Sequence, residues 1–171
     1  MAQVYLSLGS NIDRYQHITA ALNALQDAFG SMSISSVYES EAVGFKGSAF
    51  LNLVVGLETD WSVGELSRWL KRLEDQNGRK RGGPKFAPRT LDVDILTYDD
   101  CIGLIDGVEL PRGEILYNAF VLWPLAEIAP NEAHPISKEI YRVLWSRYDK
   151  TQQVLAPVEF RWQGRLISSA V

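Results

Sequence analysis

Two carboxylates stand two residues apart in an aliphatic stretch of the chain. Asp92 and Asp94 alternate with Leu91, Val93 and Ile95. Side chains at positions i and i+2 of a strand point to the same face, so a strand here places both carboxylates on one face. Paired carboxylates suit a hard cation such as Mg2+, which takes its other ligands from water and from substrate phosphates. The pattern predicts a metal site, with a solvated acidic strand face as the alternative.

A basic, glycine-containing segment precedes this stretch. Its cationic side chains surround the sequence Gly82-Gly83-Pro84, and they are Arg79, Lys80, Arg81, Lys85 and Arg89. Guanidinium groups bind phosphate oxygens through a planar fork, and metal ions neutralise the same charge. Phosphoryl transfer depends mainly on positioning and charge neutralisation, so the combination predicts nucleotide phosphate chemistry. The alternative is a solvated cationic loop.

Other catalytic classes lack their motifs. The chain has neither the glycine-lysine phosphate loop of P-loop kinases, nor a dinucleotide-binding glycine fingerprint, nor a Gly-X-Ser-X-Gly nucleophile turn. One cysteine, Cys101, excludes an intrachain disulfide. Two histidines far apart in sequence, His17 and His134, argue against a structural zinc site.

Length and charge limit the remaining possibilities. The chain has 171 residues, which favours a single domain over 1–171, and its formal net charge is −4. The clustering of cationic residues in one segment argues against nucleic acid as a partner. The sequence has no secretory signal and no apolar run long enough to cross a bilayer. We expect a cytoplasmic monomer that acts on small molecules.

The predicted elements of the first 95 residues occur in the order strand, helix, strand, strand, helix, strand. Strands are expected at 4–8, 32–38, 50–59 and 91–95, and helices at 18–29 and 62–77. The first helix is expected to take its N-cap from Gly9-Ser10-Asn11, and the second from a capping box of Ser62 and Glu65. This order predicts an α+β fold, a ferredoxin-like βαββαβ sandwich whose antiparallel sheet has its helices on one face.

That arrangement gathers polar residues on the helix-free face. Asn52 and Phe50 are expected to lie there with Asp92 and Asp94. The rest of the chain forms a C-terminal extension. It is expected to hold a short strand edge at 108–111, a strongly apolar segment from Phe120, a helix at 137–148 and a hairpin at 158–167.

Several blocks of sequence resemble the 6-hydroxymethyl-7,8-dihydropterin pyrophosphokinase family. They are Leu8-Gly9-Ser10-Asn11, Phe50-Leu51-Asn52, Glu74 through Arg79, Pro88-Arg89-Thr90-Leu91-Asp92-Val93-Asp94-Ile95, Phe120-Val121-Leu122 and Pro124-Leu125-Ala126-Glu127-Ile128-Ala129-Pro130. The resemblance implies transfer of the β,γ-diphosphate of ATP to the pterin hydroxymethyl group, with release of AMP, in folate biosynthesis.

The resemblance also implies a role for each matching residue. Asp92 and Asp94 would hold two Mg2+ ions. The pterin would be bound by Ser40, Val43, Gly44, Phe50, Asn52, Phe86 and Phe120, with Asn52 reading the amide edge and Phe50 and Phe120 flanking the ring. ATP would be bound by Glu74, Arg79, Arg81, Arg89, Ile95 and Arg112. The catalytic residues would be Arg79, Arg81, Arg89 and Asp94.

Without the resemblance, several of these residues have ordinary alternatives. Asn52 would be an exposed strand residue, Phe50 and Phe120 would belong to the core, and Glu74 would be solvated. Arg89 would pair with a neighbouring carboxylate at the surface.

The chain departs from the family pattern on the ATP side. It has Arg112 where a histidine is usual, Asn118 where an arginine is usual, and Phe86 where a tryptophan is usual. A diverged paralogue that binds pterin or nucleotide with weak or no transfer is therefore the alternative function. An RNA-binding domain of the same fold would need an aromatic motif and a basic face, and the sequence has neither.

Overall fold

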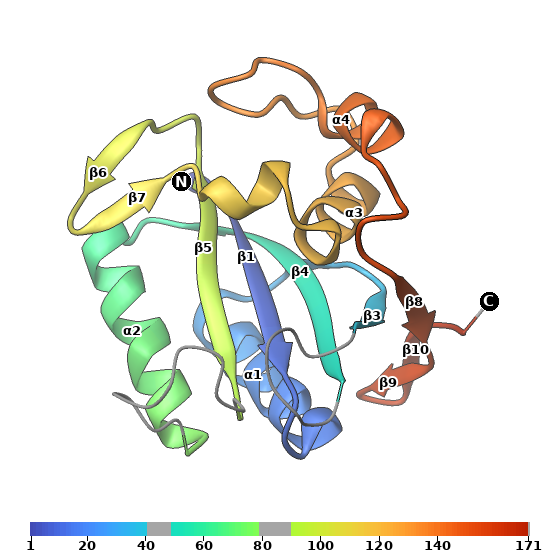
Figure 1. Ribbon diagram of the computed structural model, residues 1–171. Coiled ribbons are helices and arrows are strands. Elements are labelled where there is room, and N and C mark those ends of the chain that lie inside the picture. Colours follow the sequence, from blue (N-terminus) through green and yellow to red (C-terminus); the bar gives the residue numbers. More distant parts are fainter. Residues whose placement is uncertain (41–48, 79–89, 171) are drawn as a thin grey trace.

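The computed structural model describes residues 1–40, 49–78 and 90–170 (Figure 1). Its elements are β1 (Ala2–Ser10), α1 (Arg14–Phe29), β2 (Ser33–Ile34), β3 (Val37–Ser40), β4 (Phe50–Thr59), α2 (Val63–Gln76), β5 (Asp92–Tyr98), β6 (Gly103–Ile105), β7 (Val108–Leu110), the 3-10 helix η1 (Gly113–Leu116), α3 (Ala119–Ile128), α4 (Tyr141–Arg147), β8 (Leu155–Val158), β9 (Phe160–Trp162) and β10 (Arg165–Ser168).

The main sheet of the described residues is antiparallel, with the strand order β5-β1-β4-β3-β8. The short strand β2 also pairs with β4. The strand predicted at 50–59 is confirmed as β4, whereas the one predicted at 32–38 is wrong as a single strand. It divides into β2 and β3 at Ser35, whose hydroxyl accepts a hydrogen bond from the Val54 amide at 2.9 Å.

One face of the sheet packs against α1 and α2. Alternate residues of β1 and β5, including Leu8 and Val93, join the buried residues of both helices in one core. The predicted capping box of α2 is confirmed, because the Ser62 hydroxyl accepts from the Glu65 amide and the Glu65 carboxylate accepts from the Ser62 amide. The predicted cap of α1 is wrong. Its N-cap is Asp13, which has φ 44° and makes no side-chain cap hydrogen bond.

The other face of the sheet is covered by α3, with α4 packed outside it (Figure 1). Tyr5, Val54 and Leu96 of the sheet pack with Leu122 and Leu125 of α3 in a second core. The expectation of helices on one face only is therefore wrong. An all-round apolar helix such as α3 lacks the one-sided stripe from which a helix is recognised in sequence.

The C-terminal extension adds to the sheet and to its first face. Strand β8 pairs with β3, and the predicted hairpin at 158–167 is confirmed as β9 and β10. The predicted helix at 137–148 is too long, because α4 begins only at Tyr141, after an isolated bridge between Ala133 and Ile140. The strand edge predicted at 108–111 is confirmed as β7, which pairs with β6.

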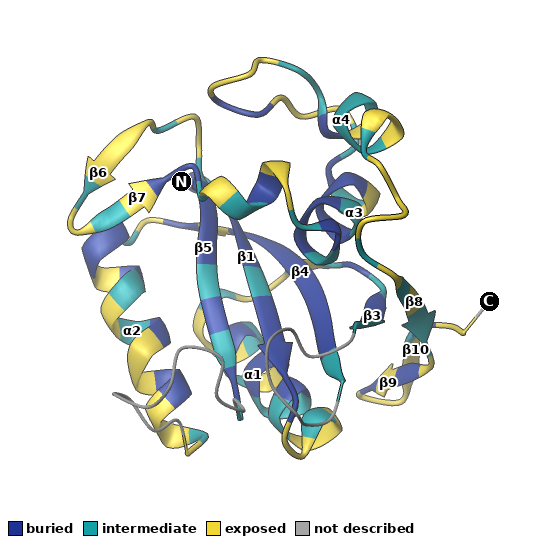
Figure 2. Ribbon diagram, in the orientation of Figure 1, coloured by how far each residue is buried: buried dark blue, intermediate teal, exposed yellow. Residues whose placement is uncertain are grey.

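Burial follows this layering. Figure 2 shows β4 buried along most of its length, and β6 exposed. None of the described helices combines the length and the apolar character that crossing a membrane requires.

Candidate active site

Three strands place polar residues in neighbouring rows across the sheet. Gly9 of β1 lies opposite Asn52 of β4 on one side and opposite Asp92 of β5 on the other. In the next row of that face, Ser7 lies opposite Asp94. Directly opposed residues share a face, so Asn52, Asp92 and Asp94 lie on the same side of the sheet, as the sequence predicted. Phe50 stands two residues before Asn52 on β4 and belongs to that face.

Gly9 leaves room for the Asn52 side chain. A Cβ atom at Gly9 would lie 3.1 Å from Asn52 Oδ1 and 3.9 Å from Phe50 Cδ1. Asn52 is buried, and its Nδ2 donates a hydrogen bond to Ser40 Oγ at 2.8 Å. Ser40 itself lies opposite Phe50 in the β3–β4 ladder. Three predicted pterin residues therefore form one group. Phe120 lies in the first turn of α3, the helix that packs across β4.

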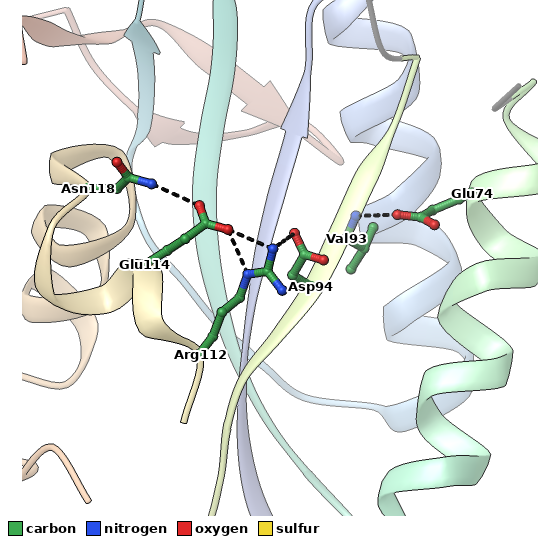
Figure 3. Close-up of polar contacts among 6 residues, drawn as sticks. All are labelled: Glu74, Val93, Asp94, Arg112, Glu114 and Asn118. Carbon is green, nitrogen blue, oxygen red and sulfur yellow. Dashed lines mark hydrogen bonds and ion pairs between the residues drawn. The ribbon is translucent and has the colours of Figure 1, made fainter. Parts of the chain in front are cut away.

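The Asp94 carboxylate faces the guanidinium group of Arg112 on the same side of the sheet. Arg112 Nη2 lies 3.6 Å from Asp94 Oδ2 and 2.6 Å from Glu114 Oε1 (Figure 3). Arg112 Nε donates to the same Glu114 oxygen at 2.7 Å. The Arg112 amide donates to the carbonyl of Leu96 at 2.9 Å, which fixes the Arg112 backbone against β5. Arg112 therefore lies beside the predicted metal ligand Asp94 and bridges two carboxylates, while its contact with ATP stays a prediction.

The environment of Asp94 disfavours its charge. Burial raises the pKa of Asp94 to about 7, and the negative charge of Asp92 acts in the same direction, while Arg112 opposes both. A cation at the two carboxylates would relieve this repulsion. Within the part of the chain that the structure describes, no group of three or more His, Cys, Asp or Glu side chains is arranged to hold a metal ion. Two carboxylates fit Mg2+, because Mg2+ retains water and phosphate ligands.

Glu74 supports the carboxylate strand. It is 5% exposed, and its Oε2 accepts a hydrogen bond from the Val93 amide at 2.8 Å (Figure 3). That amide lies between the two aspartates on an edge strand of the sheet. Sequence reasoning placed Glu74 near the nucleotide and missed this bond. The sequence did contain a signal that Glu74 is buried, because Glu74 lies four residues after Leu70, on the buried stripe of α2.

A cavity of about 520 Å³ lies beside the carboxylate strand. It is lined by three of the six predicted ATP residues, Glu74, Ile95 and Arg112, and by the two predicted metal ligands, Asp92 and Asp94, together with further residues of α2, β7 and η1. Its volume lies in the range of small-molecule sites. Sequence reasoning missed Lys71 and Tyr117 in this lining. The six predicted residues Val43, Gly44, Arg79, Arg81, Phe86 and Arg89 lie outside the described residues.

Residues 5–130 match the family model described as 7,8-dihydro-6-hydroxymethylpterin-pyrophosphokinase. The 2-amino-4-hydroxy-6-hydroxymethyldihydropteridine pyrophosphokinase of Aquifex aeolicus is 39% identical over 141 residues, which cover 81% of this chain and 88% of the relative. The protein of that name from Porphyromonas gingivalis is 36% identical over 136 residues, covering 76% of this chain and 92% of the relative.

Solved structures share the fold. A crystal structure of Plasmodium falciparum HPPK-DHPS aligns with 98% of this chain at a TM-score of 0.73 and 13% sequence identity. The aligned region is 46% of that solved chain, so this chain spans about half of its length.

Proposed function

Because this chain belongs to the 7,8-dihydro-6-hydroxymethylpterin-pyrophosphokinase family, we propose that it transfers the β,γ-diphosphate of ATP to the hydroxymethyl group of 6-hydroxymethyl-7,8-dihydropterin. AMP is the second product, and the reaction belongs to folate biosynthesis. One observation supports the assignment of this reaction to the site described above. The row Asn52–Gly9–Asp92 joins a buried amide, suited to reading a flat heterocycle, to the carboxylate strand.

The pterin side of the site is built around Asn52. Its amide group matches the alternating donors and acceptors of a pterin edge, and the hydrogen bond from its Nδ2 to Ser40 fixes the orientation of that group. Phe50 supplies a ring on the same face, and Phe120 supplies another from α3. The family pattern adds Val43, Gly44 and Phe86 to this set.

The nucleotide side of the site is the cavity lined by Glu74, Ile95 and Arg112. Asp92 and Asp94 would hold the Mg2+ ions, two by the family pattern, and bound Mg2+ neutralises phosphate charge. Arg112 supplies a guanidinium beside Asp94, where it can contact phosphate oxygens. The family pattern adds Arg79, Arg81 and Arg89 as further phosphate contacts.

The reaction is an in-line displacement at phosphorus. The hydroxymethyl oxygen forms a bond to the β-phosphorus, the bond from that phosphorus to the oxygen it shares with the α-phosphate breaks, and AMP leaves with that oxygen. The hydroxyl proton passes to solvent. The residues of this chain contribute orientation and charge, which is the main requirement of phosphoryl transfer.

We further propose a ferredoxin-like core of β1, α1, β3, β4, α2 and β5. The antiparallel order β5-β1-β4-β3 supports it. A single domain over 1–171 that acts as a cytoplasmic monomer, without nucleic-acid or membrane partners, remains part of the proposal. Relatives at 36–39% identity carry the enzyme's name and favour it over a diverged paralogue.

Nucleotide analysis of one incubation tests the proposed function. The protein is mixed with ATP, Mg2+ and 6-hydroxymethyl-7,8-dihydropterin, and AMP is expected only when the pterin is present. Asp94→Asn should abolish AMP formation, whereas Asp100→Asn, the same change at an exposed position outside the cavity, should not. Folded protein that binds pterin but forms no AMP would support the diverged paralogue instead.

A further inference from the structure

Helix α3 receives its N-terminal cap from a distant residue. Its N-cap residue, Asn118, makes no side-chain cap hydrogen bond. The amide of Ala119, the first residue of the helix, instead donates to Gln153 Oε1 at 2.7 Å. Such first-turn amides have no partner within the helix, so the contact satisfies a donor that would otherwise need water. Gln153 belongs to the C-terminal extension and lies outside the 5–130 segment that matches the family model.

The same glutamine also fixes Asn118. Gln153 Nε2 donates to Asn118 Oδ1 at 2.9 Å, and Asn118 Nδ2 donates to Glu114 Oε2 at 2.9 Å. A backbone amide can only donate and a carboxylate can only accept, so the two ends of this chain of bonds allow one orientation for each side-chain amide. The Asn118 side chain is thus available to Glu114 because Gln153 has taken over the cap.

Glu114, held by Asn118, in turn fixes the Arg112 side chain. Its second oxygen, Oε1, accepts from Arg112 Nε at 2.7 Å and lies 2.6 Å from Nη2 (Figure 3). Asn118 and Arg112 therefore hold the Glu114 carboxylate from its two sides. The guanidinium then faces Asp94 across 3.6 Å. Glu114, Asn118 and Gln153 are each half-buried, and partial exclusion of water strengthens a connected set of hydrogen bonds.

We propose that Gln153 is a positioning residue for the nucleotide side of the site. It holds Arg112 beside Asp94 through Asn118 and Glu114, and so orients the guanidinium for the phosphates of a nucleoside triphosphate. The inference rests on the proposed function in taking that ligand to be ATP. An arginine side chain has many rotamers, and fixing one of them before binding removes an ordering cost that the nucleotide would otherwise bear.

A purely structural role for Gln153 would have different consequences. Loss of the cap alone would loosen α3, and α3 carries Phe120 and packs across β4, so pterin binding and thermal stability would suffer first. Loss of positioning would affect nucleotide binding and leave pterin binding unchanged. The two roles can be separated at one position, because glutamate can still accept from the Ala119 amide but cannot donate to Asn118.

The test compares Gln153→Ala and Gln153→Glu with Gln152→Ala. Gln152 is the exposed neighbour with the same side chain, and its backbone bond to Asp149 survives the substitution. Calorimetry with Mg2+ and a non-hydrolysable ATP analogue should show about five- to tenfold weaker binding for Gln153→Glu, the size expected for one lost hydrogen bond between neutral amides, and at least as large a loss for Gln153→Ala, which also loses the bond to Ala119. Binding of the hydroxymethylpterin by Gln153→Glu, which keeps the acceptor for the Ala119 amide, and both binding constants of Gln152→Ala should stay within about twofold of the wild type.

A double-mutant cycle with Arg112→Ala shows whether Gln153 affects nucleotide binding through Arg112. If Gln153 acts through Arg112, the effect of Gln153→Glu on analogue binding should disappear in the Arg112→Ala background. The proposal is overturned if the effect persists there, if pterin binding by Gln153→Glu weakens as much as its analogue binding, or if Gln153→Glu binds the analogue as the wild type does. Melting temperatures show whether each variant folds. If Gln153→Ala does not fold, the binding results for Gln153→Glu alone decide the test.

Failure of the proposed function would look different. Wild-type protein that binds the analogue but forms no AMP would contradict the proposed reaction, while the binding cycle would still decide the role of Gln153. Wild-type protein that does not bind the analogue would overturn both.

Discussion

Asn52 and Asp92 lie in one row of the sheet with only the backbone of Gly9 between them. Neighbouring strands are about 4.8 Å apart, so two strand spacings separate the two residues by about 10 Å. In the proposed reaction, a pterin bound by Asn52 would extend its hydroxymethyl group over Gly9 toward the carboxylates. The two substrates would then meet over Gly9.

Gly9→Ala should weaken pterin binding. The added Cβ would lie 3.1 Å from Asn52 Oδ1, so the amide must shift by a few tenths of an ångström from the position that its hydrogen bond to Ser40 now fixes. Misplacing one hydrogen-bonding group costs about 0.5–1.5 kcal/mol, which corresponds to a Kd higher by a factor of roughly 2 to 13. Calorimetric titration with the hydroxymethylpterin measures this change in Kd.

Gly113→Ala serves as the matched control for this substitution. A Cβ at Gly113 would meet only Tyr117 Cε1 at 3.9 Å, an ordinary contact, so pterin affinity should not change. If Gly9→Ala still weakens binding in an Asn52→Ala background, the effect does not pass through Asn52, and the explanation fails.

Asp94→Asn should inactivate the protein and stabilise it in the absence of metal. If Asp94 holds Mg2+ as proposed, loss of this ligand should lower the rate by at least about 100-fold. The folded-state pKa of Asp94 is about 7, above its ordinary value of 3.8, so wild-type stability falls as pH rises from about 4 to about 7 and levels off above 7, where Asp94 is ionised in both states. At pH 8 the variant should gain roughly 1–2 kcal/mol, less than the whole shift implies because 27% of the Asp94 side chain is exposed.

Melting curves at pH 8 and pH 5.5 check the Asp94 prediction. The advantage of the variant should shrink at the lower pH, where wild-type Asp94 is protonated. An advantage that is equal at both pH values would show that the gain has another origin.

Two substitutions of Glu74 should separate the contribution of its hydrogen bond to Val93 from that of its negative charge. Glu74→Ala leaves the Val93 amide without its 2.8 Å acceptor, and should destabilise the protein by about 1–3 kcal/mol. Glu74→Gln retains an acceptor oxygen for that amide and should lose less. Denaturant unfolding of both variants measures the difference; equal losses would mean that the Glu74 charge matters more than the bond to Val93.

His134 should make the protein less stable in mild acid. It is buried, its Nδ1 accepts from the amides of Ile136 and Ser137 at 3.1 Å, and burial lowers its pKa. A folded-state pKa below the unfolded value of 6.5 means that stability is lost as pH falls below about 6.5, by at most about 1.4 kcal/mol per pH unit.

His134→Asn keeps a side-chain acceptor without a group that titrates near neutrality. The fall in its melting temperature between pH 7 and pH 5 should be smaller than that of the wild type. Because Asp94 titrates in both proteins, the comparison cancels its opposite contribution. Identical pH profiles would contradict the assignment to His134.

Regular patterns made much of this fold predictable. Strict alternation around Val93 marked β5, and the apolar run from Phe50 gave β4 with its observed bounds. Ser62 and Glu65 located the start of α2 through a local rule of capping. Each of these features depends on residues close together in sequence.

Features that depend on distant residues were not predictable. The covering of the second face by α3 depends on packing against Val54 and Tyr5, and Glu74 bonds an amide 19 residues further along. The β6–β7 hairpin is different, because its signal was present and missed. Asp106-Gly107 is a favoured two-residue turn, and both residues have positive φ, 50° and 82°.

The pairing of β3 with β8 has a consequence for the order of folding. Val37 lies opposite Val158, so this ladder closes a loop of about 120 residues, whereas the α2–β5 and β3–β4 contacts close much shorter ones. Long closures carry an entropy cost that is recovered only after other contacts have brought the ends together. The segment containing Gln153 immediately precedes β8, so we expect the β3–β4 and α2–β5 contacts to form before β8 is added, and the proposed support of Arg112 to be completed with β8. Maturation of nucleotide binding should thus lag behind formation of the core during refolding.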